Sequence, residues 1–198
     1  GKMSMNRPNL NDRWMTMASA TVLCTLLPWL GGCNNDNQAN PEVSGTVAVG
    51  VVGGATVASF AITNGRVADT PFATAATDAA GRYRVNVPGT PPFVVEARNG
   101  SYQDEATGGH RSLDVPLRAA ATTGGSPLNI TPFSEAAVRH AVQRGDLSEA
   151  RIDDAHRLAT HYLLGVDPLT TAPLDPTNAQ AMAKAEGPEK ALAVALGV

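Results

Sequence analysis

The sequence predicts a mainly β protein with an added helical part: an antiparallel β-sandwich followed by a small α-helical region. Turn signals built from Gly, Asn, Asp and Pro recur at short, regular intervals through residues 43–120, as they do in sandwiches. From Thr131 onward, apolar residues follow helical spacing instead. The chain has 198 residues, of which 43% are hydrophobic, so it can form one medium domain or two small ones.

The first 32 residues are expected to be a secretory signal rather than part of the fold. Three basic residues precede a mostly apolar stretch, Trp14 to Leu30, which ends in small residues. A transmembrane helix needs about 20 strongly apolar residues. Here Pro28 and Gly31-Gly32 interrupt the run early. We therefore predict that residues 1–32 are a signal peptide.

The end of this stretch, Leu30-Gly31-Gly32-Cys33, resembles the lipobox of bacterial lipoproteins. In that family the signal is cut before the cysteine, which is then acylated. The resemblance implies that Cys33 carries the lipid that anchors the mature protein in a membrane. In enteric bacteria an Asp after the cysteine retains lipoproteins in the inner membrane, so Asn34 favours the outer membrane. Residues 33–42 are polar and are expected to form a flexible tether.

Charge and cysteine content narrow the possible partners. The net charge is −3 and the predicted signal carries +2, so the mature part is acidic, at −5. Its basic residues are dispersed, which argues against nucleic acid as a partner. The second cysteine, Cys24, lies in the apolar part of the signal. No disulfide is therefore expected in the mature protein, and its stability must come from packing.

Alternation of apolar and polar residues predicts which side chains of several strands face the core. The stretch 55–62 alternates poorly, and its facing stays open. Pro116 removes a backbone donor, so its strand is expected to be an edge or to carry a bulge. The predicted inward residues are Tyr83, Val85 and Val87, then Leu113, Val115 and Leu117, and a further set at Val43, Gly45, Val47 and Val49. Arg82, Arg84 and Asn86 are predicted to face outward from the first of these strands.

Three motifs in the β part carry a family resemblance. They are Gly54-Ala55-Thr56-Val57, then Thr77-Asp78-Ala79-Ala80-Gly81-Arg82-Tyr83, then Val87-Pro88-Gly89. Together they resemble the carboxypeptidase regulatory-like domains, although that family often has Asn where this chain has Ala80. The resemblance implies a transthyretin-like, immunoglobulin-like (Ig-like) β-sandwich for residues 43–120. Domains of this family have no chemistry of their own and accompany enzymes, receptors and surface proteins.

A linker, residues 121–130, is expected before the helical region, residues 131–198. Thr131 can cap the first helix and Pro132 suits its first position, and Gly145 ends it. Ser148 can cap the second helix, and Gly165 closes it. The predicted inward stripes are Phe133, Ala136, Ala137, His140 and Ala141 in the first helix, and Ile152, Ala155, Ala159, Tyr162 and Leu163 in the second.

After a proline-containing loop at residues 166–176, two Ala-rich stretches predict two more helices. They lie near 177–186 and 188–198, and Pro188 fits the first turn of the last one. The final residues are still apolar where the sequence stops. We therefore expect the helical region to be incomplete at its C-terminus.

Two groups of side chains contain residue types that can bind a metal ion. Asp104, Glu105, His110 and Asp114 flank Gly108-Gly109, and oxygen-rich loops can bind calcium. A water-facing hairpin tip explains them better, so Asp104, Glu105 and Asp114 remain weak candidates. His156 and His161 are five residues apart, which points them in different directions on a helix. We expect no metal and no cofactor.

No phosphate-binding loop, nucleophile elbow, zinc-binding helix motif or dinucleotide fingerprint occurs in the sequence. The first hypothesis is therefore a non-catalytic envelope lipoprotein whose Ig-like domain binds glycan, peptide or another envelope protein. The alternative is an accessory domain of an envelope enzyme whose catalytic part lies beyond residue 198. A small hydrolase, in which the helices complete a cleft, is the third hypothesis.

Overall fold

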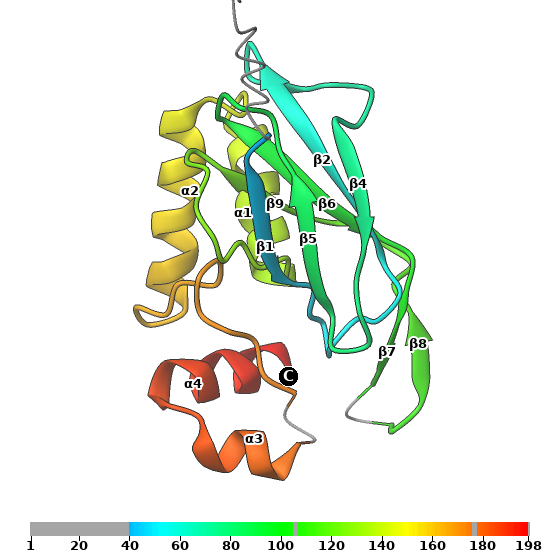
Figure 1. Cartoon of the computed structure of the whole chain (residues 1–198). Coiled ribbons are helices and arrows are strands. Elements are labelled where there is room, and N and C mark those ends of the chain that lie inside the picture. Colours follow the sequence, from blue (N-terminus) through cyan, green and yellow to red (C-terminus); the bar gives the residue numbers. More distant parts are fainter. Residues whose placement is uncertain (1–39, 105–106, 176–177, 198) are drawn as a thin grey trace, which may run out of the picture. The chain divides into compact units, whose positions relative to one another are not determined.

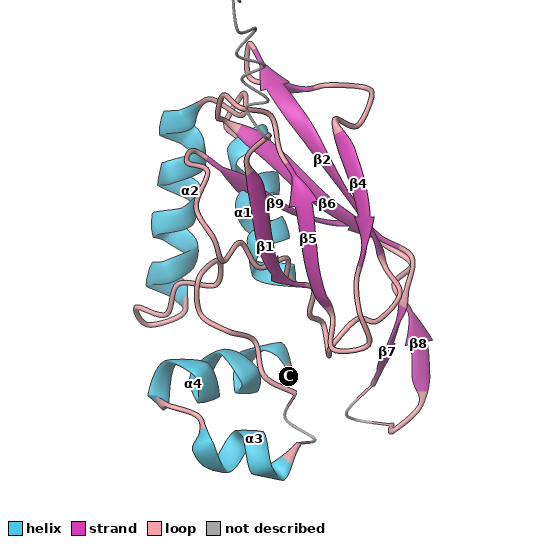
Figure 2. Ribbon diagram, in the orientation of Figure 1, coloured by secondary structure: helices cyan, strands magenta, loops and turns pink. Residues whose placement is uncertain are grey.

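The computed structural model describes residues 40–104, 107–175 and 178–197. Within them, antiparallel β-sheets come first in the chain and four short helices follow (Figure 1, Figure 2). This confirms the predicted order of a β part and a helical part. The strands are β1 (Glu42–Thr46), β2 (Thr56–Thr63), β3 (Arg66–Val67), β4 (Ala73–Ala76), β5 (Arg82–Asn86), β6 (Phe93–Arg98), β7 (Ser101–Gln103), β8 (His110–Ser112) and β9 (Leu117–Ala121). The helices are α1 (Pro132–Gln143), α2 (Glu149–Tyr162), α3 (Ala179–Lys184) and α4 (Gly187–Leu196).

The largest sheet is built on β2, which pairs antiparallel with three other strands. One edge of β2 carries β4 and, beyond the Asn64-Gly65 turn, β3, while the other edge carries β6. β9 pairs with the far edge of β6. Ala55, Val57 and Ser59 are fully buried, which defines the facing that the sequence left open. The Ser59 hydroxyl donates a 2.6 Å hydrogen bond to the carbonyl of Asn86 on β5.

A second sheet forms around β1, which pairs with β5 along one edge and with residues 128–130 along the other. The N–H of Leu128 donates to the carbonyl of Ser44 at 2.8 Å. Only glycine fits at position 45, because a Cβ there would lie 2.1 Å from the Leu128 carbonyl oxygen. The last part of the segment predicted as a linker, 121–130, therefore belongs to this sheet.

One hydrophobic cluster takes side chains from β1, β5, β2, β6 and β9. Tyr83, Val85 and Val87 are at most 3% exposed, as predicted, and Arg82, Arg84 and Asn86 between them are exposed. Of the set predicted around β1, Val43 and Val47 are fully buried and Val49 packs against the cluster. The other large members are Val52, Val57, Phe93, Val95, Leu113, Leu117, Leu128, Ile130 and Leu169.

α1 and α2 pack against the opposite face of β6 and β9. Val94 of β6 and Ala120 of β9 point to this face, because their neighbours along each strand point into the first cluster. The helices bury a stripe against them, and Ile62 and Val67 pack at its edge. The buried helix and loop residues of this second cluster are Ala137, Val138, Ala141, Leu147, Ile152 and Ala155.

The start of α1 is fixed to β9 by polar contacts. Thr131 is the N-cap and Pro132 lies in the first turn, as predicted. Ser134 completes a capping box with Thr131, which was not predicted. The Glu135 side chain is only 7% exposed and accepts hydrogen bonds from Arg118 Nε and Nη2 at 2.9 and 2.8 Å. The Arg118 backbone N–H and Arg139 Nε donate to the same carboxylate. This ion-pair cluster joins helix and sheet.

α3 and α4 are less buried than the first two helices. α3 has no buried residue, and α4 buries Leu192 and Ala193. Pro188 lies in the first turn of α4, as predicted. In the part of the chain that the structure describes, no helix combines the length and the apolar character that a membrane span requires.

Several sequence predictions about side-chain facing were wrong. The expected strand through Leu113, Val115 and Leu117 is interrupted, since β8 ends at Ser112 and β9 begins at Leu117. Val115 is 55% exposed, because the chain turns here and Pro116 has no N–H to continue a ladder. In α2, Tyr162 is 77% exposed rather than part of the buried stripe.

The facing of α1 and the capping of α2 also differ in detail. α1 buries Ser134, Glu135 and Val138 where the prediction placed Phe133, Ala136 and His140. The buried face of α1 is therefore rotated from the predicted one. The reason is that the charged Glu135 is buried through its hydrogen bonds to Arg118, which the sequence pattern did not predict. Ser148 is the N-cap of α2, but its hydroxyl donates to Asp146 Oδ1 instead of capping the helix. Gly145 and Gly165 end the helices as predicted.

Candidate binding groove

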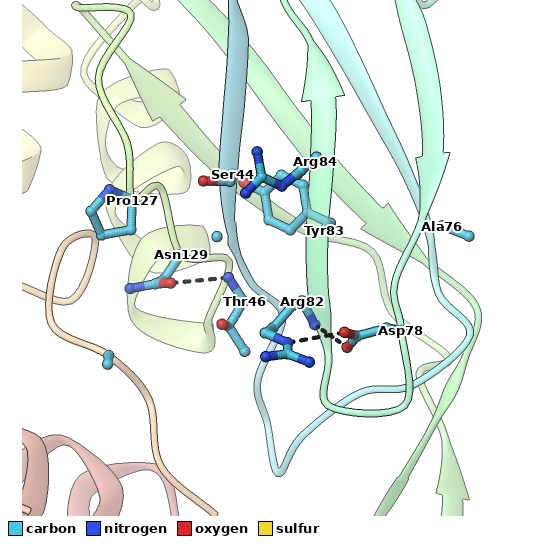
Figure 3. A pocket seen from close by; sticks show the side chains of 11 residues that line it. Ser44, Thr46, Ala76, Asp78, Arg82, Tyr83, Arg84, Pro127 and Asn129 are labelled. Carbon is cyan, nitrogen blue, oxygen red and sulfur yellow. Dashed lines mark hydrogen bonds and ion pairs between the residues drawn. The ribbon is translucent and has the colours of Figure 1, made fainter.

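The outward face of the β1–β5 pair forms the floor of an open groove with a volume of about 640 Å³. The register of the two strands places Ser44 opposite Arg84 and Thr46 opposite Arg82. The Arg82 and Arg84 side chains are 71% and 76% exposed. Figure 3 shows both guanidinium groups between Asp78 on one side and the segment of Pro127 and Asn129 on the other.

Arg82 is held by the turn that precedes β5. Asp78 accepts hydrogen bonds from the backbone N–H of Ala80 and from both the backbone N–H and Nε of Arg82, each at 2.9 Å. The backbone N–H of Arg82 is the main cause that lowers the pKa of Asp78, and the guanidinium adds to it. Gly81 allows this turn, because its φ is +71° and a Cβ would lie 2.8 Å from the Val47 carbonyl oxygen.

Arg84 is held from the other strand. Its Nη1 donates to Glu42 Oε1 at 3.1 Å, across the β1–β5 pair. Both ion pairs are exposed, so each contributes little to stability. Each carboxylate nevertheless restricts a long, flexible side chain, and each guanidinium keeps N–H donors that no described residue accepts. The two arginines therefore present partly oriented donors to the groove.

The opposite wall of the groove is fixed by buried polar contacts. Asn129 accepts a hydrogen bond from the Thr46 N–H at 3.0 Å and donates from Nδ2 to the Thr171 carbonyl at 2.8 Å. The Tyr83 hydroxyl donates to the Leu128 carbonyl at 2.5 Å, and burial raises the pKa of Tyr83 well above its usual range. Asn129 and Tyr83 are thus occupied in holding the wall against the floor.

Two hydroxyl groups on the floor of the groove make no side-chain hydrogen bond to the described part of the chain. The side chains of Ser44 and Thr46 have no hydrogen-bond partner among the described residues, and they lie in register with the two arginines. Hydroxyls can both donate and accept, whereas guanidinium groups only donate. The groove therefore offers a row of donors, two of them positively charged, with acceptors beside them.

The described lining of the groove contains few of the side chains that commonly act in acid–base or nucleophilic catalysis. Its described lining residues include no His, Cys or Lys. The one carboxylate among these lining residues, Asp78, accepts three hydrogen bonds, and its lowered pKa makes it a weak base. The described lining residues can bind and orient a ligand through their N–H and O–H donors.

No family model, curated protein or solved structure matches this chain. The groove is therefore interpreted from its own geometry.

The residues predicted to carry the lipid lie outside the described residues. Cys33 and the rest of the lipobox, Leu30, Gly31 and Gly32, are outside them. The metal candidate Glu105 also lies outside the described residues. The predicted lipidation site thus stays a prediction.

Among the other metal candidates, Asp104 makes contacts within its own hairpin. Asp104 accepts hydrogen bonds from the N–H and Oγ1 of Thr107 and pairs with Arg111 Nε at 2.5 Å, so it fixes the β7–β8 hairpin. His110 and Asp114 are exposed. Throughout residues 40–104, 107–175 and 178–197, no group of three or more His, Cys, Asp and Glu side chains has an arrangement that could hold a metal ion.

Sequence reasoning found some groove residues and missed others. Alternation placed Arg82 and Arg84 on the outside of their strand, and the Thr-Asp-x-x-Gly-x-Tyr motif contains Asp78. Glu42, Pro127 and Asn129 were missed, because only long-range pairing brings them to β5. The one local signal was the Pro-Leu-Asn-Ile run, whose Leu128 and Ile130 are buried like strand residues.

Two further hollows occur among the described residues. One, of about 610 Å³, lies beside Tyr102, Gln103 and His110 of the β7–β8 hairpin. The other, of about 440 Å³, is apolar and lies between the end of α2 and α4, near Leu164, which is 96% exposed with a φ of +55°. Neither has a pair of charged side chains oriented by partners, so the β1–β5 groove is the stronger candidate.

Proposed function

We propose that this chain is a lipid-anchored protein of the bacterial envelope, acylated on Cys33 and located in the outer membrane. Its β1–β5 groove is a non-catalytic binding site for a ligand or partner in the envelope. The anchor is supported by the basic start, the apolar stretch and the Leu-Gly-Gly-Cys sequence in that order. The sequence that follows Cys33 is polar, which is the composition expected of a tether between an anchor and a folded part.

We further propose that the β part is a transthyretin-like, Ig-like sandwich. Support comes from the single cluster that receives inward side chains from both the β1–β5 pair and the β2–β6–β9 sheet. The Thr77 to Tyr83 motif supports it as well, since Asp78 and Gly81 build the turn into β5. In such a fold the binding surface is the loops and outward faces, which is where the groove lies.

One observation carries the binding function: two arginines on one strand are each oriented by a carboxylate and point into one groove. A single exposed Arg–carboxylate pair is no sign of a site, as Arg157 with Asp154 shows, but Arg82 and Arg84 line the same groove. Fixing the side chains beforehand lowers the entropy that a ligand must overcome when it binds. The groove thus has the preorganised donors that a recognition site requires.

The binding function is tested by placing a photo-crosslinking amino acid at Thr46, on the groove floor, in cells. We expect an adduct with an envelope component, identified by mass spectrometry, that disappears in the Arg84→Gln variant. Thr74 is the matched control, because it is exposed on β4 and does not line the groove. An identical adduct at both positions, or none at Thr46, contradicts the proposal.

The anchor is tested separately by the Cys33→Ala variant. Without the thiol no diacylglycerol can be attached, so we expect uncut precursor and no incorporation of labelled fatty acid. The Cys24→Ala variant is the control and should be lipidated normally. Incorporation of the label into the Cys33→Ala protein would show that the anchor is elsewhere.

A further inference from the structure

We propose that the ligand of the β1–β5 groove is an extended acidic peptide whose carboxylates lie on alternate residues. This inference rests on the proposed binding function and names its ligand class. Arg82 and Arg84 would each receive one carboxylate, and the Ser44 and Thr46 hydroxyls would contact the peptide backbone.

The spacing of the two arginines favours an extended chain. They are two residues apart on β5 and point to the same face, so their Cα atoms are about 6.8 Å apart along the strand. Alternate side chains of an extended peptide repeat at the same interval, because the backbone geometry is the same. In a peptide that lies along β5, carboxylates on alternate residues therefore have the same spacing as the two guanidinium groups.

The chemistry of the side chains favours carboxylates. The guanidinium group is a planar fork of five N–H donors that matches a carboxylate with two parallel hydrogen bonds. Arg82 uses Nε for Asp78, and Arg84 uses Nη1 for Glu42, which leaves the other donors of each fork to a ligand. Each guanidinium already holds one carboxylate of the chain by a single hydrogen bond, so the site accepts this type of group.

The intramolecular carboxylates also compete with the ligand. Glu42 is 47% exposed and pairs with only one donor of Arg84, so a ligand can displace it or share the guanidinium. Removing the Glu42 charge should therefore strengthen binding, while removing Arg84 should weaken it. Asp78 is different, because it also holds the turn through backbone N–H groups and is not expected to leave.

The groove fits a peptide better than a polysaccharide. Sugar rings commonly stack on an exposed aromatic face, and Tyr83 is the only aromatic residue among the described lining residues. It is 3% exposed and its hydroxyl is bonded to Leu128. The floor instead offers small side chains and hydroxyls, which allow a backbone to approach closely.

The test measures binding of fluorescent synthetic probes to the lipid-free chain that starts after Cys33, by fluorescence anisotropy at low salt. The first probe is a peptide in which Glu alternates with Thr. The second has the same composition with its Glu residues grouped together, and the third is an oligomer of galacturonic acid. We expect the alternating peptide to bind most tightly and the grouped peptide several-fold more weakly, since only alternation matches the arginine spacing.

Three variants test the contacts. Arg84→Gln should weaken binding of the alternating peptide about tenfold, the loss of one charge-assisted contact, and Glu42→Gln should tighten it a few-fold. Arg157→Gln is the matched control, because Arg157 is 77% exposed, also pairs with an exposed carboxylate, and lies outside the groove. Circular dichroism of each variant verifies that it is folded.

The outcomes separate this inference from the proposed function. No binding of the alternating peptide, equal binding of the grouped peptide, or tighter binding of the galacturonic acid oligomer overturns the acidic-peptide proposal. If the Thr46 crosslink still depends on Arg84 in that case, the groove remains a binding site for another ligand. An unchanged affinity in both the Arg84→Gln and Glu42→Gln variants also overturns the inference.

Discussion

The two helix pairs among the described residues all contain several alanines and have very different attachments. α1 and α2 bury a stripe that includes Val138 and Ile152 against the sheet, and Glu135 is bonded to Arg118 of β9. α3 buries nothing, and the two buried residues of α4, Leu192 and Ala193, belong to neither core cluster. Helical spacing of alanines alone thus does not determine how firmly a helix is held.

The difference lies in the few residues that are larger or charged. Ala side chains bury little apolar area, so short Ala-rich helices gain little from packing. One Ile, one Val and one buried carboxylate give α1 and α2 the contacts that alanines do not. We therefore expect α3 and α4 to open locally, while α1 and α2 unfold only together with the sheet.

The largest effect on stability should come from truncating the bulky buried residue of each helix pair to Ala. Ile152→Ala should lower the free energy of unfolding by about 3 kcal/mol, because Ile152 is 1% exposed in the second cluster. Leu192→Ala should instead increase amide hydrogen exchange in α3 and α4 and leave the main transition nearly unchanged. Urea denaturation and hydrogen exchange measure the two results, and equal global losses would abolish the contrast.

The second effect should come from the buried carboxylate. Glu135→Gln should lower the free energy of unfolding by about 2 kcal/mol, less than for a fully buried pair, since Arg118 and Arg139 are partly exposed. Glu189→Gln is the control, because Glu189 is only partly buried and its side chain accepts one hydrogen bond, from the N–H of Glu186 at the start of α4. Its effect should be below about 0.5 kcal/mol.

The Glu135 contribution should also depend on pH. Burial raises the pKa of Glu135, but hydrogen bonds from Arg118 and Arg139 outweigh it, so the pKa lies below its usual value of 4.5. A lowered pKa stabilises the fold above the unfolded value, and this stability is lost as the pH falls through the folded pKa. The difference between the wild type and Glu135→Gln should therefore disappear in acid. A difference that persists there would point to packing instead of charge.

The smallest effect should come from His156 in α2. Burial lowers its pKa from 6.5, and the charges of Asp167 and Asp153 oppose this shift only in part. The folded state then binds fewer protons than the unfolded state, so stability falls as the pH drops below the usual pKa of His. His156→Gln should flatten this slope in urea denaturation between about pH 7 and 5. Amide exchange in α3 and α4, which contain no His, should not respond to the substitution.

The sequence predicted the parts of the fold that depend on neighbouring residues. Clean alternation gave the facing of Tyr83 and Val85, and Thr131, Pro132 and Gly145 gave the bounds of α1 nearly to the residue. The stripe of α1 was misplaced, because Glu135 is buried through a partner on β9 that no local pattern reveals.

The groove shows the same limit. Arg82 and Arg84 could be placed on an outward face, but their orienting partner Glu42 lies 42 residues from Arg84. The wall residue Asn129 lies 83 residues from Thr46. Contacts at such separations follow from strand register and from the small size of Gly45, which single-sequence patterns do not encode.

The parallel pairing of residues 128–130 with β1 also constrains how the protein is made. β1 is the first described strand to leave the ribosome, yet one of its edges has no partner until this segment has been synthesised. Contacts of such high sequence separation form slowly, and meanwhile the open edge is a template for pairing with other chains. A nascent or translocating chain shorter than about 130 residues is therefore the form most in need of a chaperone.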